Sequence, residues 1–391
     1  MDASGSSVSL KKTMTLKDLV FFGIASILGS GGFNLIGEAV MKGGNWWPLA
    51  LAIASAILLG ASRTYEEAFD AFKNNTAESD FVKKMFGEGT SIVSISAILM
   101  WNLLSISVIL VICAHMIFPD AGWLFQISFA LLLLGMMSLF SLKGLDVNKE
   151  IINYFSIGLI GILSLITVIG GIGVVQKGIV PIPQIEDQSF TASLLFFFFI
   201  LAGFDALIKF TEETIDEKDV PRSFYITNGI SITMVLGLAL AFTSWVNMKR
   251  LKFYDNGIGD IAQVFLGGGS KTYTAWFAVI YMIITTFVTF LATTRYLYSL
   301  ADLYPLLAPL KYMNSEKAPS FSILLTTITS AIGILLNNIE YLVRLSDFGL
   351  STLLVMVAAA STKSQILEGK TPWVEGLTTA SLLGLLGISF V

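Results

Sequence analysis

Long apolar blocks separated by short polar stretches run through the whole chain. The blocks are about 20 residues long, which is the length an α-helix needs to cross roughly 30 Å of hydrocarbon. Strands of a membrane β-barrel would instead be about 10 residues long and alternate in polarity. The pattern therefore predicts an all-α integral membrane protein with about eleven transmembrane helices. The predicted spans are 19–40, 46–62, 90–117, 122–142, 151–175, 190–210, 223–246, 272–298, 319–337, 340–361 and 373–391.

The composition is typical of a membrane protein and argues against several kinds of partner and site. Hydrophobic residues make up 54% of the 391 residues and charged residues only 13%, whereas soluble domains carry about 25% charged residues. A net charge of −4 provides no basic face, so nucleic acid is not an expected partner. The single cysteine, Cys113, can form neither a disulfide framework nor a cysteine-based metal site. The single histidine, His115, and the absence of an H-E-x-x-H motif argue against a membrane-embedded enzyme.

The distribution of lysine and arginine predicts the orientation, because positive residues collect in cytoplasmic loops. With the N-terminus inside, 17 of the 24 lysines and arginines fall on the inner side, Lys209 and Arg295 among them. Residues 1–18 are then a cytoplasmic leader, and the protein is expected in the plasma membrane or another cellular membrane. The polar stretch between spans two and three is expected to hold a short surface helix over 79–86.

Two of the predicted spans carry features that an uninterrupted apolar helix would not have. The first contains Gly29-Ser30-Gly31-Gly32 at its midpoint, where glycines loosen the helix and free backbone groups that must find partners. These glycines serve either close helix packing or binding. The sixth span carries Asp205, and a carboxylate at this depth is unfavourable by several kcal/mol unless it faces a cavity or a partner. Asp205 is either a functional group or the partner of Lys209, one helical turn along.

The two interruptions occupy corresponding positions in two five-span halves. Residues 19–361 are interpreted as a transporter core of repeats 19–175 and 190–361, followed by an additional C-terminal helix in 362–391. Discontinuous helices at matching positions of inverted repeats indicate a solute site near the bilayer midplane. Free N–H groups there attract a carboxylate and free carbonyls attract an ammonium group. The predicted fold is a 5+5 inverted repeat with discontinuous helices 1 and 6.

Several motifs resemble those of the amino acid–polyamine–organocation (APC) permease superfamily. Gly29-Ser30-Gly31-Gly32-Phe33 resembles the first-span G-S-G-I-F signature, with Gly32 in place of isoleucine. Gly203-Phe204-Asp205-Ala206, followed by Glu212-Glu213, resembles the G-F-D/E segment and its continuation, without the usual Asn-Pro. Thr294-Arg295-Tyr296 lies in a stretch similar to the segment after span eight. The resemblance covers roughly residues 14–362.

The resemblance implies a small-molecule substrate held between spans one and six. Backbone N–H groups of the first-span glycine segment would receive the substrate carboxylate, and residues before Asp205 would face its amine. Phe199, six residues before Asp205, would be a gate, although ordinary packing within its four-phenylalanine run is the alternative. Asn102 in span three either faces the pocket or bonds to a neighbouring helix. The substrate-binding residues implied by the superfamily are Ile27, Ser30, Gly31, Gly32, Leu201, Ala202 and Gly203.

The coupling ion is left open by the sequence. Proton-coupled relatives place a lysine inside span five, and this chain has none between residues 150 and 176. Sodium-coupled relatives use hydroxyl groups of span eight, for which Thr285, Thr286 and Thr289 are the candidates, although such threonines also bond to their own backbone. Asp205 is the candidate for proton coupling. Exchange without a coupling ion is the third option, and no cofactor or metal ion is expected.

The sequence therefore predicts a secondary active transporter or exchanger for amino acids or related amines. A nutrient sensor built on the same fold and a permease for polyamines or other organic amines are the alternatives. An ion channel is disfavoured because the chain has no repeated filter loop.

Overall fold

The structure is a computed structural model that describes residues 10–29, 35–178, 181–182, 188–245, 261, 263, 267 and 269–388. Within these ranges the secondary structure is helical, apart from an isolated parallel bridge between Met14 and Thr214. The predicted all-α class is confirmed for this part of the chain.

Every predicted span coincides with a helix or with a pair of consecutive helices. The first span corresponds to α1 and α3, and the sixth to α9 and η2, whereas the others each contain one long helix. The helices are α1 (Leu16–Leu28), α3 (Ile36–Gly43), η1 (Gly44–Trp46), α4 (Trp47–Phe72), α5 (Ala77–Phe86), α6 (Glu88–Ile117), α7 (Trp123–Ser141), α8 (Leu145–Lys177), α9 (Phe190–Leu201), η2 (Phe204–Glu213), α10 (Asp219–Trp245), α12 (Ser270–Leu303), η4 (Pro305–Lys311), α13 (Ser320–Leu336), α14 (Ile339–Leu367) and α15 (Trp373–Ile388).

Eight helical stretches of the described chain are long and apolar enough to cross a membrane. Two of them join neighbouring elements, namely Ile36–Phe72 and Phe190–Glu213, and the shorter apolar helix α13 spans Ser320–Leu336. These lengths support an integral, multi-pass membrane protein. The count of eleven spans, the inverted repeat and the domain limits remain predictions.

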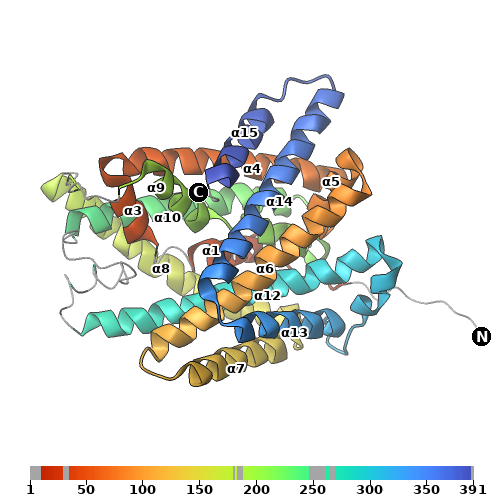
Figure 1. Cartoon of the computed structure of the whole chain (residues 1–391), viewed down its shortest axis with the longest axis horizontal. Coiled ribbons are helices and arrows are strands. Elements are labelled where there is room, and N and C mark those ends of the chain that lie inside the picture. Colours follow the sequence, from red (N-terminus) through yellow and green to blue (C-terminus); the bar gives the residue numbers. More distant parts are fainter. Residues whose placement is uncertain are drawn as a thin grey trace, which may run out of the picture.

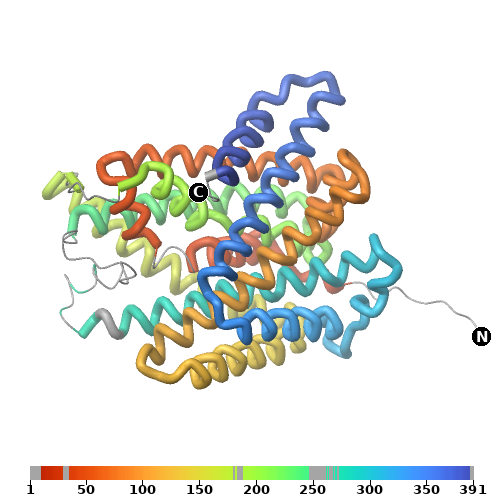
Figure 2. Tube along the Cα trace, viewed as in Figure 1, coloured from red at the N-terminus to blue at the C-terminus, as the bar shows by residue number. Residues whose placement is uncertain are grey.

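The helices pack around α1, which contacts α8, α10, α12 and η2. Figure 1 shows α1 in the middle of the bundle, with α7 and α15 at its periphery. Helix α6 lies beside α14, α12 and α13. The tube in Figure 2 follows α14 into α15, which turns back along it. Helix α1 begins where it does because Thr15 and Asp18 form a capping box that satisfies its first N–H groups.

Helix α5 is only partly the surface helix expected from the sequence, because its second half is exposed or half-buried and its first half is not. Its first turns are buried, from Ala77 to Val82. Phe81 and Val82 belong to the hydrophobic core, and the Ser79 hydroxyl is 2.5 Å from the Tyr296 hydroxyl of α12. The sequence predicted an exposed helix because many of its residues are polar. The polar side chains of its first half are buried because they bond to other elements. The bundle end formed by α5, the start of α1 and the end of η2 is called the α5 end below.

Candidate functional site

In the first predicted span, the helix that begins the span ends close to the predicted midpoint. Helix α1 ends at Leu28, with Gly29 as its C-cap, and the next described helix begins at Ile36. The predicted site residues Ser30, Gly31 and Gly32 lie outside the described residues.

The sixth predicted span is interrupted. Helix α9 ends at Leu201, Ala202 is extended, and Gly203 has a φ of 126° before η2 begins at Phe204. A residue with a Cβ adopts such a positive φ only at the expense of strain, so glycine suits this position. The structure thus has the break in span six where the sequence predicts it, and α1 ends directly before the predicted glycine segment of span one.

The two breaks are in direct contact. The Ser26 hydroxyl, near the end of α1, donates a 3.1 Å hydrogen bond to the carbonyl oxygen of Gly203. A Cβ added to Gly203 would lie 3.1 Å from the Ser26 carbonyl oxygen. The Gly203 carbonyl also accepts a 3.3 Å hydrogen bond from the Ala206 N–H group, so the Ser26 hydroxyl is a second donor that holds the α1 terminus against the α9–η2 junction.

Helix α12 meets the break in α1 from another side. The Thr285 hydroxyl donates a 2.6 Å hydrogen bond to the carbonyl oxygen of Ala25, and a Cβ on Gly29 would lie 1.7 Å from that hydroxyl. Thr286 and Thr289 instead bond to carbonyls of their own helix at 2.7 and 3.2 Å. Among the described residues, Thr285 is the one span-eight candidate whose hydroxyl bonds to α1.

The remaining predicted site residues lie around this junction or on neighbouring helices. Ile27 and Leu201 are buried, as is Ala202. Phe199 is half-buried and packs edge-on against Phe198, with ring centroids 5.8 Å apart. Asn102 on α6 is buried, and its amide nitrogen has no hydrogen-bond partner among the described residues. An unpaired buried donor of this kind is suited to a polar ligand.

Asp205 is buried and paired, two residues beyond Gly203. The Lys209 ammonium group is 2.9 Å from the Asp205 carboxylate and also donates to the Asp205 carbonyl at 2.9 Å. It lies 3.4 Å from the carboxylate of Glu78 on α5. The pairing of Asp205 with Lys209, one of the two alternatives, is confirmed, and the structure adds Glu78 to it.

A second buried ion pair closes the α5 end of the bundle. Arg295 of α12 is fully buried and binds both carboxylate oxygens of Glu213, at 2.9 and 3.4 Å. Next to it, the Ser299 hydroxyl donates to Glu212 at 2.8 Å and accepts from Asn75 at 3.0 Å. These contacts join η2, α12 and the segment before α5 across the bundle.

Sequence reasoning missed the role of these charged residues. Lys209 and Arg295 were counted among the inner positive charges, yet both are completely buried. Helix α12 continues to Leu303, so Arg295 lies inside a helix and needs an internal partner. The sequence feature that could have indicated these buried cations is the pair of adjacent acids, Glu212 and Glu213, directly after the predicted span six. Nothing in the sequence distinguishes Glu78 from an exposed loop carboxylate.

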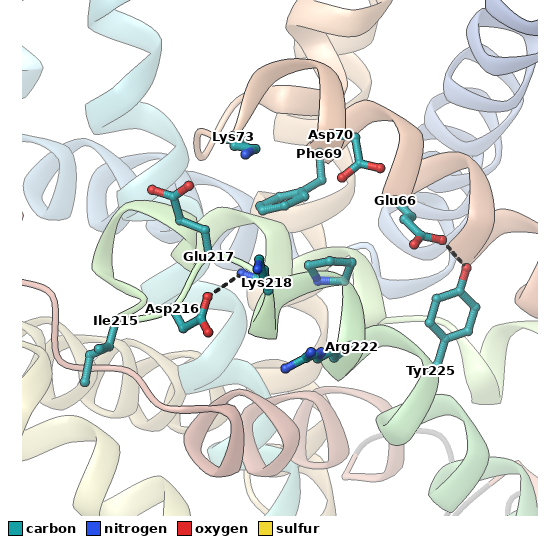
Figure 3. A pocket seen from close by; sticks show the side chains of 11 residues that line it. Glu66, Phe69, Asp70, Lys73, Ile215, Asp216, Glu217, Lys218, Arg222 and Tyr225 are labelled. Carbon is teal, nitrogen blue, oxygen red and sulfur yellow. Dashed lines mark hydrogen bonds between the residues drawn. The ribbon is translucent and has the colours of Figure 1, made fainter.

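A separate groove of about 660 Å³ opens on the surface at the end of α4. Figure 3 shows it between α4, the connection from η2 to α10, and the first turns of α10, where the Tyr225 hydroxyl donates a 2.6 Å hydrogen bond to Glu66. Its lining is mostly charged and includes no residue that the sequence assigned to the substrate site. The groove is therefore distinct from the junction of the two breaks.

Comparison with known proteins identifies the family. A model of the amino acid permease family matches residues 14–390, which is almost the whole chain. The chain belongs to the amino acid permease family. The permease is also similar to the inner membrane transport protein YbaT of Escherichia coli (strain K12), with 22% identity over 268 residues. That alignment covers 66% of the permease and 61% of YbaT. The alignment therefore spans about three-fifths of the length of YbaT, and the family assignment rests on the model that matches almost the whole permease.

Proposed function

We propose that the permease is a secondary transporter or exchanger that moves an amino acid or related amine by alternating access. The contact between Ser26 and Gly203 carries this proposal, because it joins two interrupted helices whose free backbone groups suit opposite ends of a zwitterion. N–H groups at the start of a half-helix favour the carboxylate, and free carbonyls favour the ammonium group. In this proposal Phe199 closes over the bound solute, and the amide group of Asn102 on α6 forms a hydrogen bond with that solute.

Two groups of helices are the moving parts of this mechanism. The first consists of α1, α3, α4, α9, η2 and α10, and the second of α6, α7, α12 and α13. Contacts are extensive within each group, for example between α4 and α9 and between α12 and α6. Opening at the α5 end would separate η2 from α12 and break the Arg295–Glu213 pair. The Arg295–Glu213 pair is accordingly proposed to keep the α5 end closed while the opposite end of the site is open. Phe199 would close that opposite end while the α5 end is open.

Counterflow in liposomes tests the proposal directly. Purified permease in vesicles preloaded with one amino acid should accumulate the same labelled amino acid from outside, and empty vesicles should not. A panel of amino acids and polyamines, assayed with and without proton and sodium gradients, would identify both substrate and coupling. Binding of a solute without counterflow would contradict transport and favour a sensor.

Replacing Thr285 with valine tests sodium coupling. The substitution removes the hydroxyl that bonds to Ala25 and keeps the side-chain shape, so it should weaken the α1–α12 contact by about 1 kcal/mol. If this hydroxyl helps to hold sodium, stimulation of counterflow by sodium should disappear. Thr286→Val is the matched control, because Thr286 bonds only to its own helix and should retain the sodium response. An unchanged sodium response in Thr285→Val would exclude the site.

A further inference from the structure

Glu78 is a buried carboxylate with no close hydrogen-bond donor among the described residues. It lies in the first turn of α5, none of its surface is exposed, and neither of its carboxylate oxygens accepts a hydrogen bond from a described residue. Its nearest cation is the Lys209 ammonium group, 3.4 Å from one oxygen. Native proteins rarely leave a buried carboxylate this poorly satisfied, so its state of protonation needs an explanation.

The charges around Glu78 do not balance when every group is ionised. Lys209 is the cation for both Glu78 and Asp205, and all three side chains are buried. Lys209 makes its two short bonds, each 2.9 Å long, to Asp205. One negative charge is therefore left over, and it falls on Glu78. An uncompensated buried charge is strongly unfavourable, whereas a protonated carboxyl group is neutral.

The other elements around α5 do not supply the missing cation in the described part of the chain. Tyr65 of α4 and Tyr296 of α12 face the carboxyl group, and both are neutral in their ordinary state. On α6, Glu88 pairs with Lys83, and on α14 the Lys363 ammonium group bonds to a backbone carbonyl at Met85. Burial raises the pKa of Glu78 from 4.5 to about 7, although Lys209 acts in the opposite direction.

We propose that Glu78 is a proton-binding site, and that the permease takes up a proton there when α5 and η2 close against each other. On closing, a carboxylate oxygen of Glu78 accepts a proton from water and becomes a neutral carboxyl group. On opening at the α5 end, water solvates the group and the proton returns to solution. The link to transport rests on the proposed function, whereas proton binding can be measured without any flux.

The pH dependence follows from the two states of Glu78. In the closed state its pKa is about 7, and in an open, hydrated state it should approach the ordinary value of 4.5. Between these pH values the closed state holds a proton that the open state lacks. Protonation therefore stabilises closure at low pH, and this stabilisation is lost as the pH rises through about 7.

Infrared difference spectroscopy of the full-length permease in liposomes tests the proposal. Raising the pH from about 5 to about 8 should remove the carbonyl band of a protonated carboxyl group. Glu78→Gln should show a smaller change, because the contribution of Glu78 is removed, and Glu88→Gln, a matched control at an exposed carboxylate, should show the full wild-type change. A band that keeps its full wild-type amplitude and midpoint in Glu78→Gln would overturn the assignment.

Lys209→Gln provides a second test that does not require removing Glu78. Without the ammonium group, the midpoint of the band should rise by about one pH unit or more. An unchanged or lower midpoint would also overturn the assignment. If wild-type protein shows the Glu78 band but no counterflow of any solute, the proton site stands and the proposed function fails. If it shows counterflow without the band, the proton site fails and the proposed function stands.

Discussion

Replacement of Arg295 with methionine is expected to lower the free energy of unfolding by about 3–5 kcal/mol. The guanidinium group is fully buried and binds both carboxylate oxygens of Glu213, so its removal leaves an uncompensated carboxylate inside the bundle. Methionine has a similar length and keeps most of the packing, which makes the lost charge the main change. Thermal unfolding of the purified protein in detergent should show a large fall in melting temperature, and counterflow should be lost with it.

Two variants separate the buried charge from a general effect of losing arginine. Arg344 also forms an ion pair, 2.8 Å from Glu340, but both side chains are more than three-quarters exposed. Arg344→Met should therefore change the stability by only about 0.3–0.5 kcal/mol. The double variant Arg295→Met, Glu213→Gln should be more stable than Arg295→Met alone, because the unpaired charge has been removed. Equal effects of Arg295→Met and Arg344→Met would show that the buried pair is not a structural seal.

Most of the fold could be predicted because the feature that produces it, a long apolar block, is repeated many times along the chain. Each apolar block is long enough to cross the hydrocarbon, and none of these predictions depends on a distant residue. The break at Gly203 and the end of α1 at Gly29 were also predictable, because a cluster of glycines loosens a helix and a deep carboxylate is unfavourable in one that faces lipid. Local sequence therefore determines where the helices lie and where two of them stop.

The charged part of the site could be predicted only where both partners lie on one helix. Lys209 follows Asp205 by one turn, so their pairing could be read from spacing. Glu78 and Arg295 meet their partners across the bundle, and the sequence contains no spacing that connects them. Arg295 lies inside the predicted span 272–298 but was counted with the inner positive charges, so no internal partner was sought for it. Long-range pairing of charges is the information that the structure adds.

Replacement of Gly203 with valine is expected to reduce counterflow to background. Gly203 has a φ of 126°, which a β-branched residue adopts only with strain of about 1–3 kcal/mol. Its new Cβ would also lie 3.1 Å from the Ser26 carbonyl oxygen, tighter than an ordinary contact. The strain can be relieved only by moving the α9–η2 junction away from α1. Since the proposed site is formed where these two breaks meet, even a small displacement should abolish transport.

Gly161→Val is the matched control for this substitution. Gly161 lies on an exposed face of α8, and a Cβ there would meet no atom within 4 Å. The same added volume should therefore leave counterflow near the wild-type rate. Melting temperatures of both variants would show whether lost transport in Gly203→Val reflects a loss of folded protein. If Gly203→Val folds and transports normally, close contact between the two breaks is not needed for solute movement, and the binding site must lie elsewhere in the bundle.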